Sequence, residues 1–419
     1  MKKLISIFLV LATVVSCFIS TASAGEIDIL LDVLVEQGVL TPIKAEIVRD
    51  ETKKRVAEEI AQGKHPNLPK WIQTTKLKGD LRLRFQSEKK TNDDDYDNEG
   101  RIRARIGLES KLAEDLKVGV GIATAGSSND ARSRNVTLKD QFDTFEVVWD
   151  YGYFEWTPRK DLKLVCGKFK RKTYLWLPTD MLWDGDITPE GVSLNWIGSL
   201  TDDIDFWANT GVWILDENGH SDVADPFMDY VQIGLQTKKS MVDAKLATTF
   251  YDFQGIEDID LGNDKTSQGS NNSVYGTTHR SISPAVEVGF KEPFGGLPFK
   301  IDERIAFFGE YVQNLDNDII KDELAGWSTG FKLGHKKVKK KGNWQMKYIY
   351  TKLQNDAFPD IFPDSDRFGG NTGIEAHEVA FKYALRKNVI FGLDYYQSWN
   401  MSASDNKQNL VQADLVFKF

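Results

Sequence analysis

The residues best suited to chemistry gather in one segment, 171–187, RKTYLWLPTDMLWDGDI. It combines bulky rings with three acids, namely Tyr174, Trp176, Trp183, Asp180, Asp184 and Asp186. Bases stand at its start: Lys168, Lys170, Arg171 and Lys172. Acids facing bases would create a transverse electric field that favours small polar solutes in a narrow passage. The alternative is a solvated loop on a rim, although such a loop seldom needs two tryptophans.

A second set of charges alternates with apolar residues in two short stretches. Its members are Lys76, Lys78, Arg82, Arg84, Arg101, Arg103 and Arg105. On a strand facing lipid each cation would cost about 2–4 kcal/mol near the bilayer midplane, so these side chains should line an interior wall. The row could guide anions or balance wall acids such as Asp80 and Glu109. The formal net charge of −9 favours balancing.

Enzymatic chemistry finds little support in the sequence. The five histidines are scattered, and neither a GxSxG nor an HExxH motif nor a glycine-rich phosphate loop occurs. Four aspartates in 93–97 lack the spacing of an EF-hand and are interpreted as a solvated loop tip. We therefore assign no catalytic residue, metal or cofactor. The acidic net charge also argues against a nucleic-acid partner.

The elements that must position these residues are strands. From Thr74 to Phe419 the apolar residues alternate with polar ones, in segments of the length that a tilted strand needs to cross a bilayer. Sixteen such segments are predicted: 74–87, 100–111, 116–126, 144–157, 161–170, 188–198, 203–216, 226–238, 242–253, 281–291, 299–313, 326–338, 342–353, 375–386, 388–400 and 408–419.

The connections between these segments alternate between long and short. This pattern is typical of an all-β, transmembrane, antiparallel up-and-down β-barrel, here of 16 strands. Hydrocarbon offers no partner to backbone N–H and C=O groups, so the sheet must have no free edge. We therefore expect 408–419 to pair with 74–87, with Phe417 and Phe419 on the lipid side.

The N-terminal residues divide into three parts before the barrel at 74–419. Residues 1–24 predict a signal peptide, with Ala22-Ser23-Ala24 as the cleavage site, although Cys17 also fits a lipoprotein signal. Residues 25–63 form a helical segment, expected in the periplasm with two helices in 26–62, and 64–73 is a linker. The helices could form a coiled coil that trimerises the barrels, or pack against the barrel base.

Several stretches resemble the Putative porin family of diderm bacteria, over nearly the whole mature chain. They are GDLRLRFQ (79–86), RIRARIGLESKLAEDLKVGVGIATAG (101–126), LVCGKFKRKTYLWLPTDMLWDGDITPEGVSLNW (164–196) and FWANTGVWILDENG (206–219). The resemblance implies water-filled outer-membrane channels, often trimers, with an inward loop after the fifth strand, here 171–187. Lys168 departs from the arginine of similar sequences and would bind an anion less well in bidentate fashion.

The resemblance also implies the surroundings of the protein. Outer-membrane lipid and lipopolysaccharide would surround a homotrimer, and Phe419 resembles the C-terminal signal for the barrel-assembly machinery. The expected function is a porin for passive diffusion of small hydrophilic solutes and ions. The alternatives are a substrate-specific channel of the same fold, a plugged barrel acting as a scaffold or adhesin, and an outer-membrane hydrolase.

Overall fold

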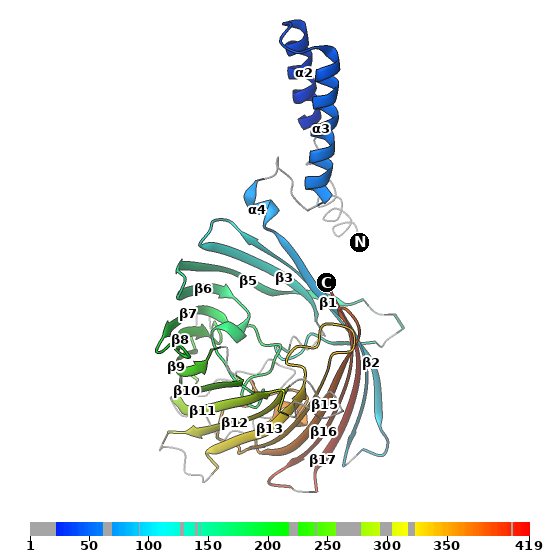
Figure 1. The fold of residues 1–419 in the computed structure, drawn as a ribbon. Coiled ribbons are helices and arrows are strands. Elements are labelled where there is room, and N and C mark those ends of the chain that lie inside the picture. Colours follow the sequence, from blue (N-terminus) through cyan, green and yellow to red (C-terminus); the bar gives the residue numbers. More distant parts are fainter. Residues whose placement is uncertain are drawn as a thin grey trace. The chain divides into compact units, whose positions relative to one another are not determined.

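The computed structural model describes residues 22–61, 69–91, 93–125, 130–138, 141–142, 144–217, 225–238, 241–256, 278–293, 304–316, 323–403 and 405–419. The chain separates into two compact units, Met1–Thr75 and Lys76–Phe419 (Figure 1). Most of the predicted signal peptide, with Cys17, lies outside the described residues. Within the described ranges, no helix has both the length and the apolar character of a membrane span.

The first unit contains α2 (Ala22–Glu36), α3 (Pro42–Ala61) and the short α4 (Lys70–Gln73). Gly38 has a φ of +68°, and this left-handed conformation follows the end of α2. Thr41 caps the start of α3, because the Lys44 backbone N–H donates to Thr41 Oγ1 at 3.4 Å and Pro42 is the first helical residue. Leu31 and Ala45 are buried where α2 and α3 pack together.

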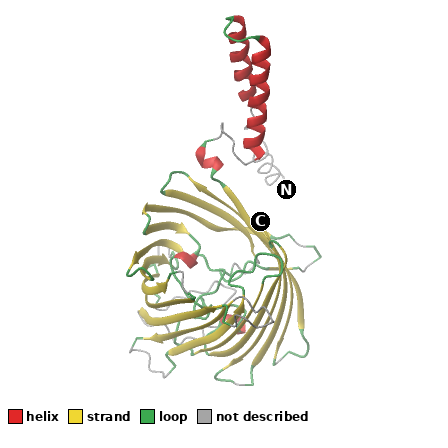
Figure 2. Ribbon diagram, viewed as in Figure 1, coloured by secondary structure: helices red, strands yellow, loops and turns green. Residues whose placement is uncertain are grey.

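The second unit is a single antiparallel sheet closed into a barrel (Figure 2). Its strands are β1 (Lys76–Lys90), β2 (Asp97–Lys111), β3 (Leu116–Ala125), β4 (Val136–Thr137), β5 (Glu146–Arg159), β6 (Leu162–Lys168), β7 (Glu190–Ser199), β8 (Ile204–Ile214), β9 (Phe227–Thr237), β10 (Val242–Gln254), β11 (Thr278–Lys291), β12 (Arg304–Asn314), β13 (Ala325–Gly334), β14 (Trp344–Leu353), β15 (Ile374–Arg386), β16 (Val389–Asn400) and β17 (Lys407–Lys418). Apart from the two-residue β4, each long strand pairs with its neighbours in sequence order.

The sixteen long strands coincide with the sixteen predicted segments, so the predicted fold is confirmed. One strand of the described residues was not predicted, the two-residue β4, which lies in the long connection after β3. β2 extends beyond the end of β3, and β4 pairs there with Arg101 and Ile102 of β2. A backbone stretch that would otherwise be unpaired is thereby satisfied.

The barrel closes where the last strand meets the first, as predicted. β17 pairs with β1 from Gln408 opposite Lys90 to Lys418 opposite Asp80. The final residue continues this register, because the Phe419 N–H donates to the Gly79 carbonyl at 3.1 Å and the Gly79 N–H donates back at 2.9 Å. No strand edge therefore remains at the seam.

Side chains alternate between an apolar outside and a polar inside. On β1, Leu83 and Phe85 are exposed on the outer face, while Asp80, Arg84 and Gln86 are buried inside. Exposed apolar residues recur on most of the other long strands, from Val120 on β3 to Val411 on β17. A continuous apolar exterior of this kind suits a hydrocarbon surrounding.

Two glycines test how tightly the seam, where β1 pairs with β17, is packed. A Cβ atom at Gly79 would overlap the Arg105 carbonyl oxygen and the Phe419 ring, whereas at Gly152, on β5, it would meet nothing. We expect Gly79→Ala to destabilise the barrel by about 1–3 kcal/mol through overpacking and Gly152→Ala to leave it unchanged. Urea midpoints from heat-modifiable gel mobility measure both variants. Equal midpoints for the two would show that the seam tolerates the extra atom.

Candidate functional site: loops inside the barrel

Segment 171–187, between β6 and β7, folds into the barrel. Tyr174, Leu175, Met181, Leu182 and Trp183 are all at most 2% exposed. They pack in one apolar cluster with inward side chains of β8, β9, β10 and β12. Burial of these rings explains why a connection between strands carries so many large apolar residues.

The connection between β14 and β15, 354–373, also enters the barrel and meets segment 171–187. The Trp183 ring stacks on Phe362, with 4.5 Å between ring centres. The Asp184 N–H donates to the Phe362 carbonyl at 2.7 Å, and Asp184 Oδ2 accepts from the N–H and Oγ of Ser365 at 3.0 and 3.2 Å. The two loops therefore form one packed unit inside the ring of strands, where Figure 2 draws loop segments.

Segment 171–187 is also anchored to well-separated strands of the wall. Asp186 forms ion pairs with Arg103 and Arg105 of β2 at 3.2 and 3.0 Å. Gln232 of β9 bonds both the N–H and the carbonyl of Trp176, and Thr179 donates to Glu310 of β12. Because β2 and β12 are far apart around the ring, the segment crosses the lumen.

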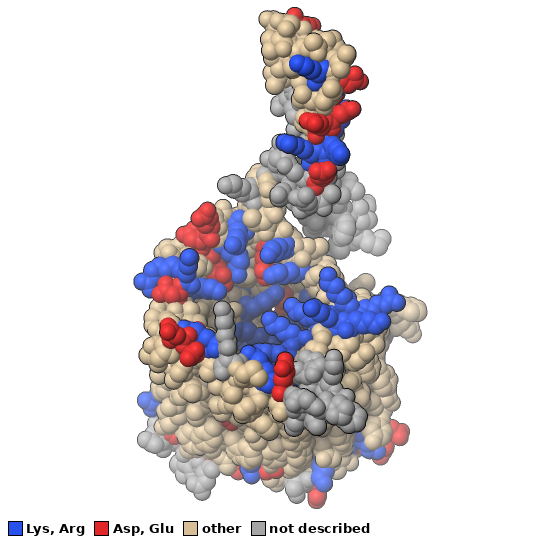
Figure 3. Space-filling model, viewed as in Figure 1, with Lys and Arg blue, Asp and Glu red and all other residues tan. Residues whose placement is uncertain are grey.

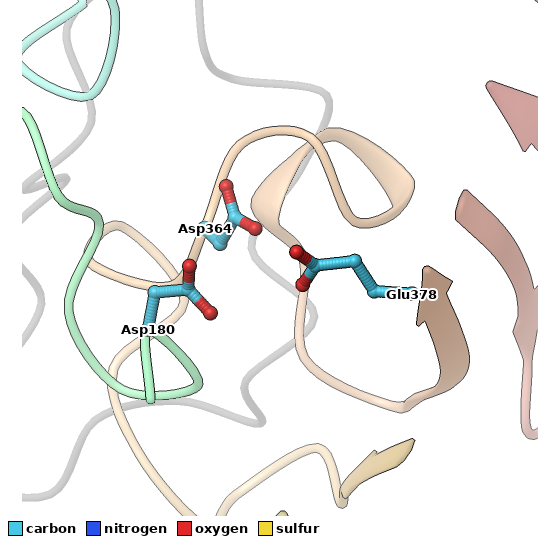
Figure 4. Close-up of side chains that lie close together, drawn as sticks. All are labelled: Asp180, Asp364 and Glu378. Carbon is cyan, nitrogen blue, oxygen red and sulfur yellow. The ribbon is translucent and has the colours of Figure 1, made fainter. Parts of the chain in front are cut away.

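Arg367, in loop 354–373, joins the two loops to the wall. Its guanidinium lies 2.5 Å from Asp180 and 3.2 Å from Asp364, and it also pairs with Glu378 of β15. Figure 4 shows these three carboxylates converging. Their oxygens lie within 4.8 Å of one another, a spacing that could hold a metal ion. Arg367 already supplies the positive charge there, so the arrangement works as an ion-pair centre.

The pKa values of the loop acids reflect these partners. Burial alone would raise the pKa of Asp180, but Arg367 outweighs it and holds that pKa below its usual range. Asp186 behaves in the same way, with Arg103 and Arg105 as the lowering charges. Asp184 differs, because burial and the nearby Asp186 charge raise its pKa to about 7 despite the hydrogen bonds that it accepts.

The basic residues predicted for the wall are mostly held in ion pairs. Arg84 binds Asp414 of β17 at 2.7 Å, and Arg103 and Arg105 share Asp80 at 3.0 and 2.7 Å. The remaining members are Lys78, paired with Glu109; Arg82, 3.6 Å from Asp414 and bonded to Asn135; Arg101, 3.9 Å from Glu99; and Lys76, exposed at the start of β1.

The structure distributes the bases at the start of segment 171–187 in different ways. Arg171 is buried and donates to the carbonyls of Trp183 and Asp184. Lys170 is exposed, with its Nζ 4.3 Å from the centre of the Tyr151 ring, and Lys172 is exposed too. Lys168 pairs with Glu190 of β7, and strand alternation places it on the outer face with Cys166. The structure thus does not bring Lys168 to the loop.

Sequence reasoning missed loop 354–373, which was assigned only as a long connection. Phe358 and Phe362 mark it by the same criterion that singled out 171–187, namely bulky apolar residues in a connection between strands. The loop after β3 was missed as well. Its Arg132 donates to the carbonyls of Asp360 and Gly370, and its Arg134 pairs with Asp150 at 3.0 Å.

A closed sheet with an apolar exterior and a charged interior defines a transmembrane β-barrel of the outer-membrane type. One solved structure supports this fold. The high-pH structure of OprB from Pseudomonas putida is similar over 83% of this chain and 94% of that chain, at 9% identity and a TM-score of 0.56. Two further matches have a TM-score of 0.43. A Rhodopseudomonas blastica porin triple mutant matches over 82% of this chain and 100% of that chain, at 10% identity. A loop-deletion mutant of OmpT from Vibrio cholerae matches over 83% of this chain and 100% of that chain, at 12% identity.

Comparison with models of protein families identifies the family of the chain. The family model described as Putative porin matches residues 88–283 and 299–419, so the chain belongs to that family. It is accordingly a channel of the bacterial outer membrane and not an enzyme. A search of curated proteins gives no match.

Arg367 should be needed to hold the loops in the lumen. Arg367→Gln removes the cation between the buried Asp364 and Glu378 and the half-buried Asp180, and breaking a buried pair in this way costs about 3–5 kcal/mol. We expect a lower urea midpoint, monitored by tryptophan fluorescence. Arg386→Gln, at the exposed end of β15, is the matched control and should not change the midpoint. Equal midpoints for both variants would contradict a structural role of Arg367.

Asp184 should make the loop contact depend on pH. A carboxyl whose pKa is raised in the folded protein stabilises it fully below the ordinary pKa of 3.8, and this contribution is lost as pH rises through about 7. We expect the urea midpoint of the wild type to fall between about pH 4 and pH 7. Asp184→Asn should flatten this part of the profile. Parallel profiles for both proteins would exclude Asp184 as the titrating group.

Proposed function

We propose that the channel supports passive diffusion of small hydrophilic solutes and ions, and that segment 171–187 is its constriction. The observation that carries the proposal is the crossing of the lumen by this segment, with Asp186 bound to β2 and Thr179 bound to β12. A barrel of sixteen strands is too wide for wall side chains alone to fill, so inward loops must set the width of the passage.

Loop 354–373 is proposed as the second half of the constriction. The apolar cluster fills the lumen in front of β8, β9 and β10, and β1, β2 and β17 contribute no described residue to it. The inward side chains of those three strands are instead mainly charged or amide-bearing, as at Arg84, Arg103 and Gln412. These three side chains are buried, whereas Lys172, Lys382 and Lys418 are exposed. A water-filled path therefore fits best on this side of the lumen, past the three lysines.

A plugged barrel is the second candidate, because two packed loops occupy the lumen. Such a barrel would act as a scaffold or adhesin through its outer loops. Liposome swelling with small sugars separates the two functions, since a plugged barrel gives no swelling. A substrate-specific channel would swell liposomes too, but a low concentration of its solute would block the single-channel current.

The proposed assembly is a homotrimer in outer-membrane lipid and lipopolysaccharide, delivered by the barrel-assembly machinery through Phe419. The helical unit offers surface for association. Ile29, Leu30, Ile43 and Ile47 of α2 and α3 are each more than half exposed. Apolar side chains at this density favour contacts between copies as a coiled coil. Insertion of a trimer into a planar bilayer would give three equal closing steps, and single steps alone would contradict it.

Release of the proposed constriction should increase conductance. Asp186→Asn removes the charge that Arg103 and Arg105 hold, which loosens the segment from β2. In planar bilayers we expect a larger or noisier single-channel current than in the wild type. Asp202→Asn, in the exposed turn between β7 and β8, is the control and should match the wild type. If Asp186→Asn also matches it, segment 171–187 does not limit the current.

A further inference from the structure

Three lysines on the inner side of the barrel have no carboxylate partner among the described residues. They are Lys172 of the constriction segment, Lys382 of β15 and Lys418 of β17, all of them exposed. We propose that this lysine cluster, defined by these three residues, is a binding site for small anions and makes the channel anion-selective. The inference rests on the proposed channel function and names the class of solute that the channel would favour.

The strand pattern places two of the lysines in the lumen. Lys382 lies on the same face of β15 as the buried, inward Ala380 and Ala384, and Lys418 shares the inward face of β17 with Asp414. The strand register brings the two wall lysines near each other, because Lys382 pairs with Gly392 of β16 and Gly392 pairs with Asp414 of β17, four residues before Lys418. The charge of Lys382 accordingly acts on Lys418, and it acts on Lys172 as well. Because they are exposed on an inward face, their ammonium groups meet water inside the barrel.

The acids nearest to the cluster are already occupied. Asp80 lies directly opposite Lys418 in the β1–β17 register, but its two oxygens accept from Arg103 and Arg105. Asp186 is bound by the same two arginines, and Asp180 by Arg367. Asp180 and Asp186 are therefore neutralised by arginines, and Asp184 is occupied by hydrogen bonds from Ser365, whereas no described carboxylate forms an ion pair with the three lysines.

One nearby carboxylate offsets part of the positive charge of the lysine cluster. Asp394 of β16 lies near Lys382 and Lys347, and its Oδ1 has no hydrogen-bond partner among the described residues. Lys347 is itself paired with Glu378. One free acid beside three exposed lysines leaves a local excess of positive charge, although the whole chain carries −9.

Like charges held together in a recess attract counter-ions. Figure 3 shows a hollow in one face of the barrel with Lys and Arg side chains gathered around it. Low-dielectric walls focus such a field and raise the local concentration of ions of opposite sign. Ammonium groups are strongly hydrated point charges with three donors each, which suits transient binding of chloride, carboxylates or phosphate during permeation.

The test measures ion selectivity of the purified full-length protein in planar bilayers. With KCl at about 1 M on one side and about 0.1 M on the other, the zero-current potential gives the permeability ratio of chloride to potassium. We expect chloride to be favoured about threefold or more. Inorganic phosphate added to both sides should reduce the chloride current in a concentration-dependent manner.

A triple variant and a matched control locate the effect. Lys172→Gln, Lys382→Gln and Lys418→Gln together should bring the ratio to about one or below and abolish the block by phosphate. Lys337→Gln, Lys339→Gln and Lys341→Gln remove the same charge from the exposed turn between β13 and β14 and should leave both readings as in the wild type.

Each outcome has a distinct meaning. A wild-type channel that conducts but prefers potassium overturns the inference and leaves the channel function intact. An unchanged ratio in the triple variant overturns the assignment to the lysine cluster. Absence of any conductance in the wild type overturns the proposed function itself. Gel mobility on heating shows in each case that the variant barrel is folded.

Discussion

The structure depends on one constraint, that a backbone in hydrocarbon must satisfy every N–H and C=O group within itself. The pairing of β17 with β1 meets it, down to the two hydrogen bonds between Gly79 and Phe419. The same constraint accounts for β4, which completes the edge of β2 where β3 ends. Once the sheet is closed, its outer residues face lipid and its inner residues face one another or water.

The interior of the barrel therefore contains many charged side chains, and most of them need a partner of opposite charge. Arginines on β1 and β2 are paired with Asp80, Asp186 and Asp414, and Arg367 holds Asp180 against Glu378. Guanidinium groups suit this role because their planar forks bind carboxylates in bidentate fashion. Lysines dominate the charges left facing water. The division between arginines that build the loops and lysines that face the passage follows from this difference in hydration.

Much of the fold could be predicted from the sequence, because strand periodicity and connection length are local signals. Leu83 and Phe85 point outward and Arg84 inward by alternation alone. The contacts of the candidate site were harder to predict from the sequence. Its contacts join residues far apart in the chain, such as Asp186 with Arg103 and Asp180 with Arg367, and no local pattern specifies them. Loop 354–373 carried the same apolar signal as 171–187, whereas the position of Lys168 depended on strand register at the end of β6.

The seam between β1 and β17 also governs how the protein can be made. Its two strands lie far apart in the sequence, and two of the closing hydrogen bonds join Gly79 to Phe419. Until β17 has been synthesised, the sheet has two open edges that would pair with other chains. The strands must consequently be kept from pairing with other chains until β17 can join β1. Closure of the barrel is therefore a late event, in which two strands that are far apart in the sequence pair with each other.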